Sequence, residues 1–551
     1  MYIRRTLRPD GYTREAYRNN VWGHVSVSDY EHTRPPILRG DEHRSNTVLI
    51  RITFRNYCDI AIPGLANRRH LPELYLMPLQ TKSGFLDRTL KNLKEGWQNI
   101  AGSSYDASAA SNRPDLPDAD LNRIRQQMSE CLEAKGGEVS ARARAAALGH
   151  VYLALDTTGK ERFLRLMAQE FDLNRDTIDV AIGDVRRAES DQERATAETR
   201  LRRSLEAPRV KLMTQFNALP EGVKFLVDMR ADLLPMARKD PLLKGLEQDL
   251  KGLLTSWFDV GFLELRRITW NKSSAALLEK LIAYEAVHAI ESWDDLKNRL
   301  DSDRRCFAYF HPRMPDEPLI FVEVALVKGM SANVQALLDE SAPLGNPEDA
   351  DTAIFYSISN AQKGLAGISF GNFLIKRVVG QLTNELKGLK TFATLSPVPG
   401  FVNWLGKTIA AGQAGLLTPS ERKAINSITG KNGGAKGVLK SVLSNPDWVN
   451  DEDLYQVMKV PLLRLCANYL INEKGRQNRA LDPVANFHLS NGAVMERLNW
   501  AGDRSENGLK QSAGIMINYL YDLDVIEENH EAYTGAGKIT ASSALKNISK
   551  G

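Results

Sequence analysis

Residues 352–382 constrain the fold more than any other stretch of this 551-residue chain. An apolar run with strand character at 352–358 leads into a glycine-rich segment, and a pattern with helical spacing follows at 373–382. The glycines of this connection are Gly364, Gly367 and Gly371. A helix that starts after such a turn presents unpaired backbone N–H groups and a partial positive charge, which both favour an anion. The stretch therefore predicts an α/β region that contains a phosphate loop.

This loop does not fit two familiar nucleotide-binding patterns. No GK[ST] follows it, which excludes a Walker loop, and its glycines are out of register with GxGxxG. It resembles the pyrophosphate loop of the acetyltransferase-type (GNAT) fold, written Q/R-x-x-G-x-G/A, although Leu365 stands at the first glycine of that pattern. A glycine-rich connection that serves only chain geometry is the alternative.

The rest of the chain divides by its pattern of apolar residues. We assign residues 1–80, which are irregular apart from one possible strand at 47–54, to an N-terminal extension of unknown role. Residues 81–266 are predicted to form a helical domain. It includes a Ser/Ala/Asn/Pro-rich linker at 102–117, and its helical pattern runs from about residue 118 to 260. Apolar side chains recur there at helical spacing, as in Phe163, Leu164, Met167 and Phe171, and again in Phe225, Leu226, Met229 and Leu233.

Short apolar runs mixed with helical patterns mark residues 267–551 as the α/β domain. Strands are predicted at 304–310, 319–327, 352–358 and 389–395. The predicted fold class is therefore α+β, with an N-terminal all-helical bundle followed by an α/β domain that holds the chemistry.

The net charge and the spacing of the cysteines limit which partners and which cellular compartment we expect for this protein. The 72 Lys and Arg against 68 Asp and Glu give a net charge of +4, too balanced to indicate a nucleic-acid partner. The cysteines, Cys58, Cys131, Cys306 and Cys466, are too far apart in sequence for a zinc ribbon, and they fit a reducing compartment. No apolar run reaches the roughly 18–20 residues of a membrane helix, and the first twenty residues lack the apolar region of a secretory signal. We expect a cytoplasmic protein without a membrane partner.

Several long motifs, in order along the chain, resemble the malonyl-CoA decarboxylase family. They are residues 355–367, 371–379, 395–401, 482–494 and 499–503, and the resemblance runs from about Ile268 to Tyr521. The resemblance implies a helical domain used in oligomer assembly, by homology a tetramer, and a GNAT-like catalytic domain that binds coenzyme A. Malonyl-CoA and acetyl-CoA are then the expected ligands.

The resemblance also implies the residues of the site. Ser396 and His488 match the catalytic serine and histidine, and Tyr521 matches a further active-site tyrosine. The segment that would bind the CoA pyrophosphate comprises Ala366, Gly367, Ile368, Ser369, Phe370, Gly371 and Asn372. Relatives often have a glutamate at the position of Ser369, so any role of that carboxylate does not carry over to this chain.

The chemistry of such a reaction makes modest demands on the protein. Malonyl-CoA carries its own electron sink, because loss of CO2 leaves an enolate delocalised onto the thioester oxygen. We therefore expect no metal and no organic cofactor, only donors for the oxyanion and a proton for the carbon. An imidazole such as His488 suits proton transfer, with an ordinary pKa near 6.5. Ser396, followed by Pro397 and Pro399, is expected to position the substrate and relay a proton rather than to attack it.

Other interpretations of these residues stay open at this point. Without the resemblance, Ser396 is an ordinary turn residue and His488 a core histidine. His311 is the rival histidine, although a His-Pro turn is usually structural, and Lys376 with Arg377 could meet the CoA phosphates or lie on a solvated face. Glu323 could act as the base of an acyl-CoA-dependent N-acyltransferase, which is the alternative function. A non-enzymatic acyl-CoA sensor is the third.

Overall fold

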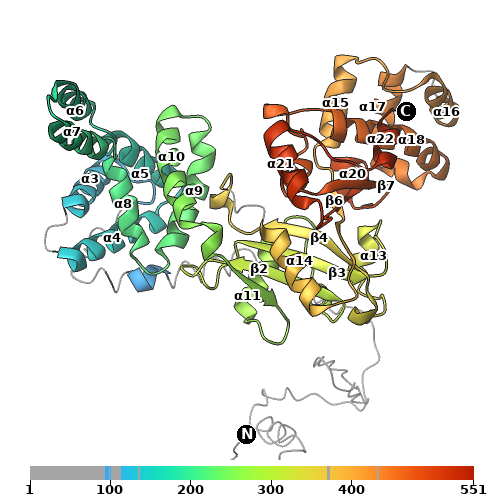
Figure 1. Ribbon diagram of the computed structural model, residues 1–551, viewed down its shortest axis with the longest axis horizontal. Coiled ribbons are helices and arrows are strands. Elements are labelled where there is room, and N and C mark those ends of the chain that lie inside the picture. Colours follow the sequence, from blue (N-terminus) through green and yellow to red (C-terminus); the bar gives the residue numbers. More distant parts are fainter. Residues whose placement is uncertain are drawn as a thin grey trace, which may run out of the picture. The chain divides into compact units, whose positions relative to one another are not determined.

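The computed structural model describes residues 93–97, 100, 113–133, 137–368, 373–430 and 434–550. These residues belong to one compact unit that spans Leu79–Gly551 (Figure 1). The predicted N-terminal extension, its strand at 47–54 and most of the predicted linker lie outside the described residues. Within the described residues, no helix combines the length and apolar character that crossing a bilayer requires.

The first part of the described chain is all helical. Its helices are α3 (Asp118–Glu133), α4 (Gly137–Ala154), α5 (Thr157–Glu170), α6 (Arg175–Arg187), α7 (Asp191–Ser204), α8 (Pro208–Asn217), α9 (Gly222–Ala237) and α10 (Pro241–Trp257). Side chains of Asp156, Asn174 and Ser190 accept a hydrogen bond from the first turn of α5, α6 and α7, respectively, and so fix where each begins. The apolar positions predicted in α5 and α9 are buried in one continuous core, which confirms the helical pattern.

A mixed sheet organises the second part. Its strands are β1 (Glu264–Ile268), β2 (Arg304–Phe310), β3 (Ile320–Val327), β4 (Thr352–Asn360), β5 (Thr391–Thr394), β6 (Ser396–Pro397), β7 (Val494–Asn499) and β8 (Met516–Leu520). They lie in the order β1-β2-β3-β4-β5-β8-β6, with β7 also paired to β8. Only β4 and β5 run parallel to each other, and every other pair is antiparallel. The four predicted strands correspond to β2–β5, and the fold class predicted from the sequence is confirmed.

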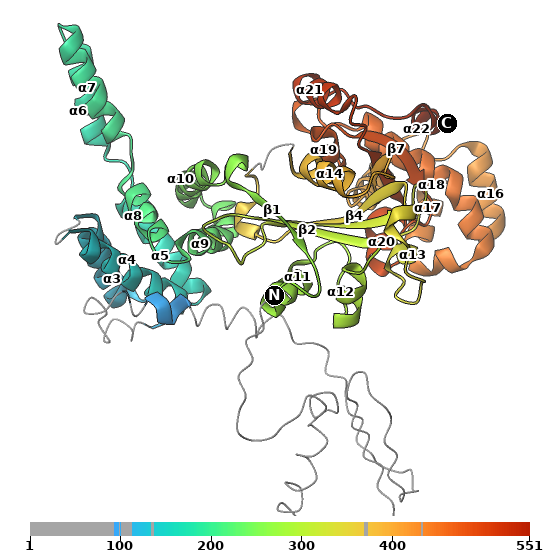
Figure 2. The same ribbon diagram turned by 60° about the horizontal axis from the view of Figure 1, so that its bottom comes forward.

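Helices cover both faces of this sheet. Figure 2 shows α14 (Phe373–Glu385) on one face and α11 (Ala275–Tyr284) with α12 (Trp293–Arg299) on the other. Alternation along the strands explains the two layers: Val322 and Phe355 join the core of the α14 face, whereas Phe321 packs with the α11 and α12 side chains. Neighbouring residues of one strand therefore pack into cores on opposite faces of the sheet.

The C-terminal elements gather around β6, β7 and β8 (Figure 1). They are α13 (Val334–Leu338), which comes earlier in the chain, and then α15 (Phe401–Ala411), α16 (Pro419–Thr429), α17 (Ala435–Leu443), α18 (Glu452–Asn472), α19 (Pro483–Ser490), α20 (Glu506–Ser512), α21 (Ile526–Ala536) and α22 (Ser543–Lys550). Of these, α19 and the residues that follow β8 bring side chains to the end of β5.

Candidate active site

Ser396 lies where the chain leaves β5 and enters the short strand β6. Its backbone pairs with Ile517 of β8, and its side chain is buried. The Ser396 hydroxyl donates a hydrogen bond to Oγ1 of Thr394, at 2.8 Å, and lies 3.1 Å from Nε2 of His488. The serine is therefore held in one orientation by two neighbours.

His488 reaches this serine from the last turn of α19. The helix starts sharply because Pro483 occupies its first position and the Asp482 carboxylate accepts hydrogen bonds from the N–H groups of Val484 and Ala485. The imidazole is 3% exposed, and the ring of Tyr519 stacks on it with centroids 4.4 Å apart. A rigid helix and an aromatic ring thus fix the plane of the histidine.

Tyr521 completes the series from the far side of the imidazole. Its hydroxyl is 2.8 Å from Nδ1 of His488, and its backbone N–H donates to the carbonyl of Phe392 in β5. The ring packs edge-on against Phe355 of β4, and burial raises the pKa of its hydroxyl well above the ordinary value. Tyr521 therefore keeps its proton at physiological pH.

Burial also decides the charge of the histidine. It lowers the pKa of His488 to about 3, and no carboxylate among the described residues opposes that shift. At neutral pH the ring carries a single proton, so one nitrogen donates and the other accepts. Ser396, His488 and Tyr521 then form an uncharged, hydrogen-bonded series suited to passing protons.

The structure brings together three residues that are far apart in sequence, and it adds one that sequence reasoning missed. Thr394 is fully buried and contacts the site serine directly. A threonine at the end of an apolar strand carries no sequence signal for function, because the same residue type is favoured in any strand.

The predicted pyrophosphate segment follows β4 through a short 3-10 helix, Lys363–Leu365. A Cβ on Gly364 would lie 1.7 Å from the carbonyl oxygen of Val227 in α9, so only glycine fits there. Gly367 has φ +74, in the left-handed region that favours glycine. Of the predicted CoA-binding residues, Ala366, Gly367 and Ile368 are described, whereas Ser369, Phe370, Gly371 and Asn372 lie outside the described residues.

The two basic residues of α14 have other partners. Lys376 forms an ion pair with Glu527, and Arg377 donates to the backbone carbonyl of Leu263. His311, the other candidate histidine, contacts the backbone through both ring nitrogens. Its Nε2 lies 3.0 Å from the carbonyl oxygen of Trp257, and its Nδ1 accepts a hydrogen bond from the N–H of Arg313. These contacts give all three side chains structural roles.

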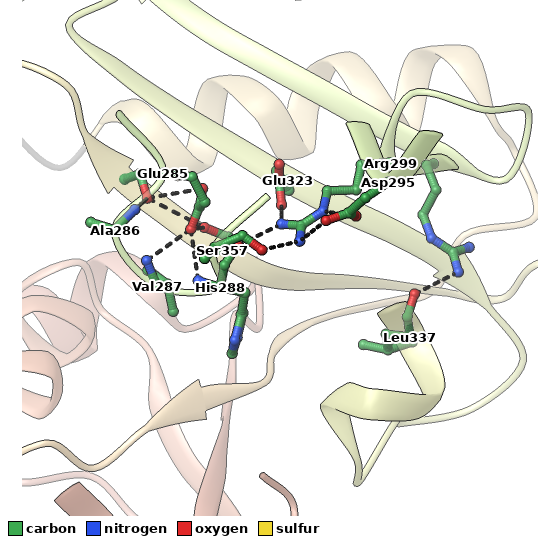
Figure 3. Close-up of polar contacts among 12 residues, drawn as sticks. Glu285, Ala286, Val287, His288, Asp295, Arg299, Glu323, Leu337 and Ser357 are labelled. Atoms are coloured by element: carbon green, nitrogen blue, oxygen red, sulfur yellow. Dashed lines mark hydrogen bonds and ion pairs between the residues drawn. The ribbon is translucent and has the colours of Figure 1, made fainter. Parts of the chain in front are cut away.

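Glu323 lies on the opposite face of the sheet from α14. Figure 3 shows Glu323 and Asp295 both pointing toward Arg299, and the Glu323–Arg299 ion pair measures 3.1 Å. Burial raises the pKa of the Glu323 carboxyl to about 8, against the opposing effect of the guanidinium. The carboxylate is 1% exposed and already paired, so it is poorly placed to act as a base on a substrate.

A pocket of about 590 Å³ opens on that same side, next to the Glu285 loop that also appears in Figure 3. Its ionisable lining residues are Glu285, Glu291, Asp503, Glu506, His288 and Lys510. Four carboxylates against one lysine would repel the phosphates of a coenzyme A thioester. This pocket therefore does not favour a coenzyme A thioester.

Comparison with known proteins finds relatives that belong to one family. Residues 261–551 match the family model described as "Malonyl-CoA decarboxylase C-terminal domain", and residues 171–258 match "Malonyl-CoA decarboxylase N-terminal domain". The mitochondrial malonyl-CoA decarboxylases of Anser anser anser and Mus musculus are 43% and 42% identical over 361 and 364 residues, which cover 63% and 64% of this chain and 71% and 73% of theirs.

Solved structures give the same result at the level of the fold. The malonyl-CoA decarboxylase of Rhodopseudomonas palustris is 44% identical, with a TM-score of 0.71, and that of Agrobacterium vitis is 40% identical, with a TM-score of 0.70. Each alignment covers 78% of this chain and 99% of the solved chain. The similarity thus includes both the helical region and the sheet.

Proposed function

The chain belongs to the malonyl-CoA decarboxylase family, and we propose that Ser396, His488 and Tyr521 form the site at which it converts malonyl-CoA into acetyl-CoA and CO2. The observation that carries this assignment is the buried hydrogen-bonded series Ser396–His488–Tyr521 with a neutral imidazole at its centre. Such a series supplies a proton without placing a charge beside the substrate.

The reaction breaks one carbon–carbon bond. The electron pair that held the carboxylate moves onto the thioester as an enolate, and CO2 leaves uncharged. A proton must then be delivered to the former methylene carbon, so the net reaction consumes one proton. An uncharged, water-poor site favours CO2 loss because it stabilises the dispersed charge of the enolate better than the localised charge of the carboxylate.

Each residue then has a distinct part in protonation. Ser396 gives its hydroxyl proton to the enolate carbon, and its oxygen takes the Nε2 proton of His488 at the same time. The bare Nδ1 of His488 takes the Tyr521 hydroxyl proton, so the imidazole stays neutral in its other tautomer, and a proton from water restores the tyrosine. The imidazole proton returns from Nδ1 to Nε2 before the next turnover. Concerted transfer avoids a charge on Tyr521, since burial makes its phenolate unfavourable.

Coenzyme A is proposed to bind through the loop from Ala366 to Asn372. The left-handed turn at Gly367 and the position of the loop before α14 support this, because backbone N–H groups at a helix start favour pyrophosphate. We propose that the reaction needs no metal and no organic cofactor.

An acyl-CoA-dependent N-acyltransferase is less well supported. Its base would be Glu323, which is buried, paired with Arg299 and on the other side of the sheet from α14. The structure offers the lyase a connected proton donor and offers the transferase no free base at that position.

The assay that tests this function follows CO2 and acetyl-CoA together. Purified protein is treated with a chelator, gel-filtered and given malonyl-CoA without an acceptor amine. We expect equimolar release of both products at the rate of untreated protein. Release that depends on an amine would support the transferase instead, and activity lost to the chelator but restored by a metal would contradict the cofactor-free proposal.

We further propose a homo-oligomer, as a tetramer, and a cytoplasmic location. Exposed apolar side chains near α6 and α7 support assembly: Val180 is 62% and Leu205 54% exposed.

The free, buried thiols of Cys131, Cys306 and Cys466 fit a reducing compartment. The goose and mouse relatives are named mitochondrial, so cell fractionation is the test of the compartment.

A further inference from the structure

We propose that Thr394 is a positioning residue that sets the direction of the proton series, so that protons pass from Tyr521 through His488 to Ser396 and not the other way. This inference rests on the proposed decarboxylase function. Thr394 touches no substrate atom in this account, and it acts through the Ser396 hydroxyl.

Thr394 is held on two sides by the neighbouring strand β8. Its side-chain oxygen accepts a hydrogen bond from the backbone N–H of Tyr519, at 3.2 Å, and its carbonyl accepts one from Nδ2 of Asn518, at 2.7 Å. Asn518 is itself fixed, since its side-chain oxygen accepts from Asn499. The threonine is 0% exposed, so no water competes for these contacts.

A direction follows from the donors around this oxygen. The Tyr519 N–H can only donate, and the Ser396 hydroxyl also donates its proton to Thr394 Oγ1. A hydroxyl has one proton, so Ser396 cannot also donate to His488. The 3.1 Å contact between Ser396 and His488 therefore requires a proton on Nε2 of the imidazole.

The same reasoning applies to Tyr521, at the other end of the series. Burial keeps His488 neutral, so a proton on Nε2 leaves Nδ1 bare. Tyr521, 2.8 Å from Nδ1, must then be the donor. One threonine thus fixes the tautomer of the histidine and the orientation of a tyrosine hydroxyl three hydrogen bonds away.

This direction is the one that decarboxylation needs. Protonation of the enolate requires hydrogen-bond donors that point toward Ser396. It also requires a proton on Nε2 of His488, which replaces the proton that the serine gives up. In the reverse arrangement, Ser396 would donate to a bare Nε2, and the histidine would act as a base toward the serine. That arrangement suits activation of a nucleophile and not delivery of a proton to carbon.

The test compares two substitutions that separate the hydroxyl group of Thr394 from its methyl group. Thr394→Val removes the hydroxyl and keeps the shape, whereas Thr394→Ser keeps the hydroxyl. Thr391→Val, at the start of the same strand, is the control for loss of a threonine hydroxyl outside the site. Each protein is labelled with ¹⁵N-histidine, and the His488 signal is identified by its absence in His488→Gln.

We expect the ¹⁵N spectrum of the parent to show His488 protonated at Nε2, and Thr394→Ser and Thr391→Val to match it. In Thr394→Val we expect the proton to shift wholly or partly to Nδ1, and kcat for malonyl-CoA to fall about 10- to 100-fold with little change in KM. A loss of packing alone would not move the proton between nitrogens.

An Nδ1-protonated His488 in the parent would overturn the inference even if Thr394→Val failed to fold. An unchanged Nε2 proton in folded Thr394→Val would overturn it as well. If the tautomers behave as expected but the parent releases no CO2 from malonyl-CoA, the proposed function fails while the role of Thr394 in the hydrogen-bond series stands.

Discussion

At the scale of single residues, burial turns His488 from an ordinary titratable group into a neutral one. Its folded-state pKa of about 3 lies below the ordinary value of 6.5, so the unfolded chain takes up a proton between these pH values and the native chain does not. Folding stability therefore falls as the pH drops from 6.5 toward 3, by about 1.4 kcal/mol per pH unit from this group, and is unaffected by it above 6.5.

We expect His488→Gln to reduce this acid sensitivity. Urea unfolding at pH 7 and pH 5 should show a smaller loss of stability for the variant than for the parent. His530→Gln is the matched control, because His530 is a partly buried histidine outside the series that contacts the Ser490 carbonyl. An equal loss of stability in the parent and in His488→Gln would show that His488 is protonated at pH 5 in the folded protein.

The neutral histidine also predicts a pH profile for catalysis. Because the pKa of His488 is about 3 and that of Tyr521 is raised, neither group titrates near neutrality. We expect kcat to stay level between about pH 5 and pH 8 when it is measured under conditions in which the protein stays folded. A sigmoidal change in kcat centred near 6.5 that disappears in His488→Gln would contradict a neutral imidazole.

These residues also show how much of the candidate site could be predicted from the sequence alone. Ser396 and His488 are 92 positions apart, so nothing in their spacing predicts that they meet, and only the resemblance pointed to them. Thr394 could not be found, because its role comes from a contact with the β8 backbone that sequence periodicity does not encode.

At the scale of elements, the glycine-rich connection after β4 has two separate functions. Gly367 provides a left-handed turn, whereas Gly364 allows the chain to pack directly on the backbone of α9. The sequence predicted the turn and the helix after it, because both follow from local rules. It could not predict the contact with Val227, which lies 137 positions earlier in the chain.

We expect Gly364→Ala to destabilise the protein by about 2 kcal/mol or more, because its Cβ would overlap the Val227 carbonyl and the backbone would have to move. Gly380→Ala is the control: that glycine is exposed in α14 with no atom within 4 Å of the added Cβ, so helix propensity should raise stability by about 0.5–1 kcal/mol. Thermal unfolding checks both. A parent-like Tm for Gly364→Ala would mean that the loop does not pack on α9.

Strand prediction succeeded for β2, β3, β4 and β5 and missed the other strands of the sheet, including the buried strand β8. The strands β2 and β3 are buried along nearly their whole length and read as apolar runs. The strands β1 and β7 were not predicted because they carry charged side chains such as Glu264, Arg266 and Glu496 on a partly exposed surface. Only tertiary pairing makes them strands.

At the scale of the whole molecule, a helical region precedes a sheet that holds the site on its α14 side. The sequence predicted the fold class, and the first strand of the sheet starts at Glu264. The division into separate domains near residue 266 stays a prediction. Assembly and compartment depend on surfaces and partners outside one chain, and they stay predictions.

We expect light scattering to give a mass near four times 61.5 kDa at micromolar concentration. Val180→Glu, on the exposed side of α6, should lower that mass because burying a charge in an interface is costly, whereas Leu344→Glu in the α/β region serves as a control of similar exposure. A monomeric mass for the parent would contradict the oligomer.

The central claim is that Ser396 and His488 act as one unit that delivers a proton during malonyl-CoA decarboxylation. A double-mutant cycle on kcat, with Ser396→Ala, His488→Gln and the double variant, tests it most directly. We predict that each single change lowers kcat on the order of 10²-fold or more and that the double variant is no slower than the worse single variant. Effects that multiply in the double variant, or a parent-like rate in either single variant, would contradict the account.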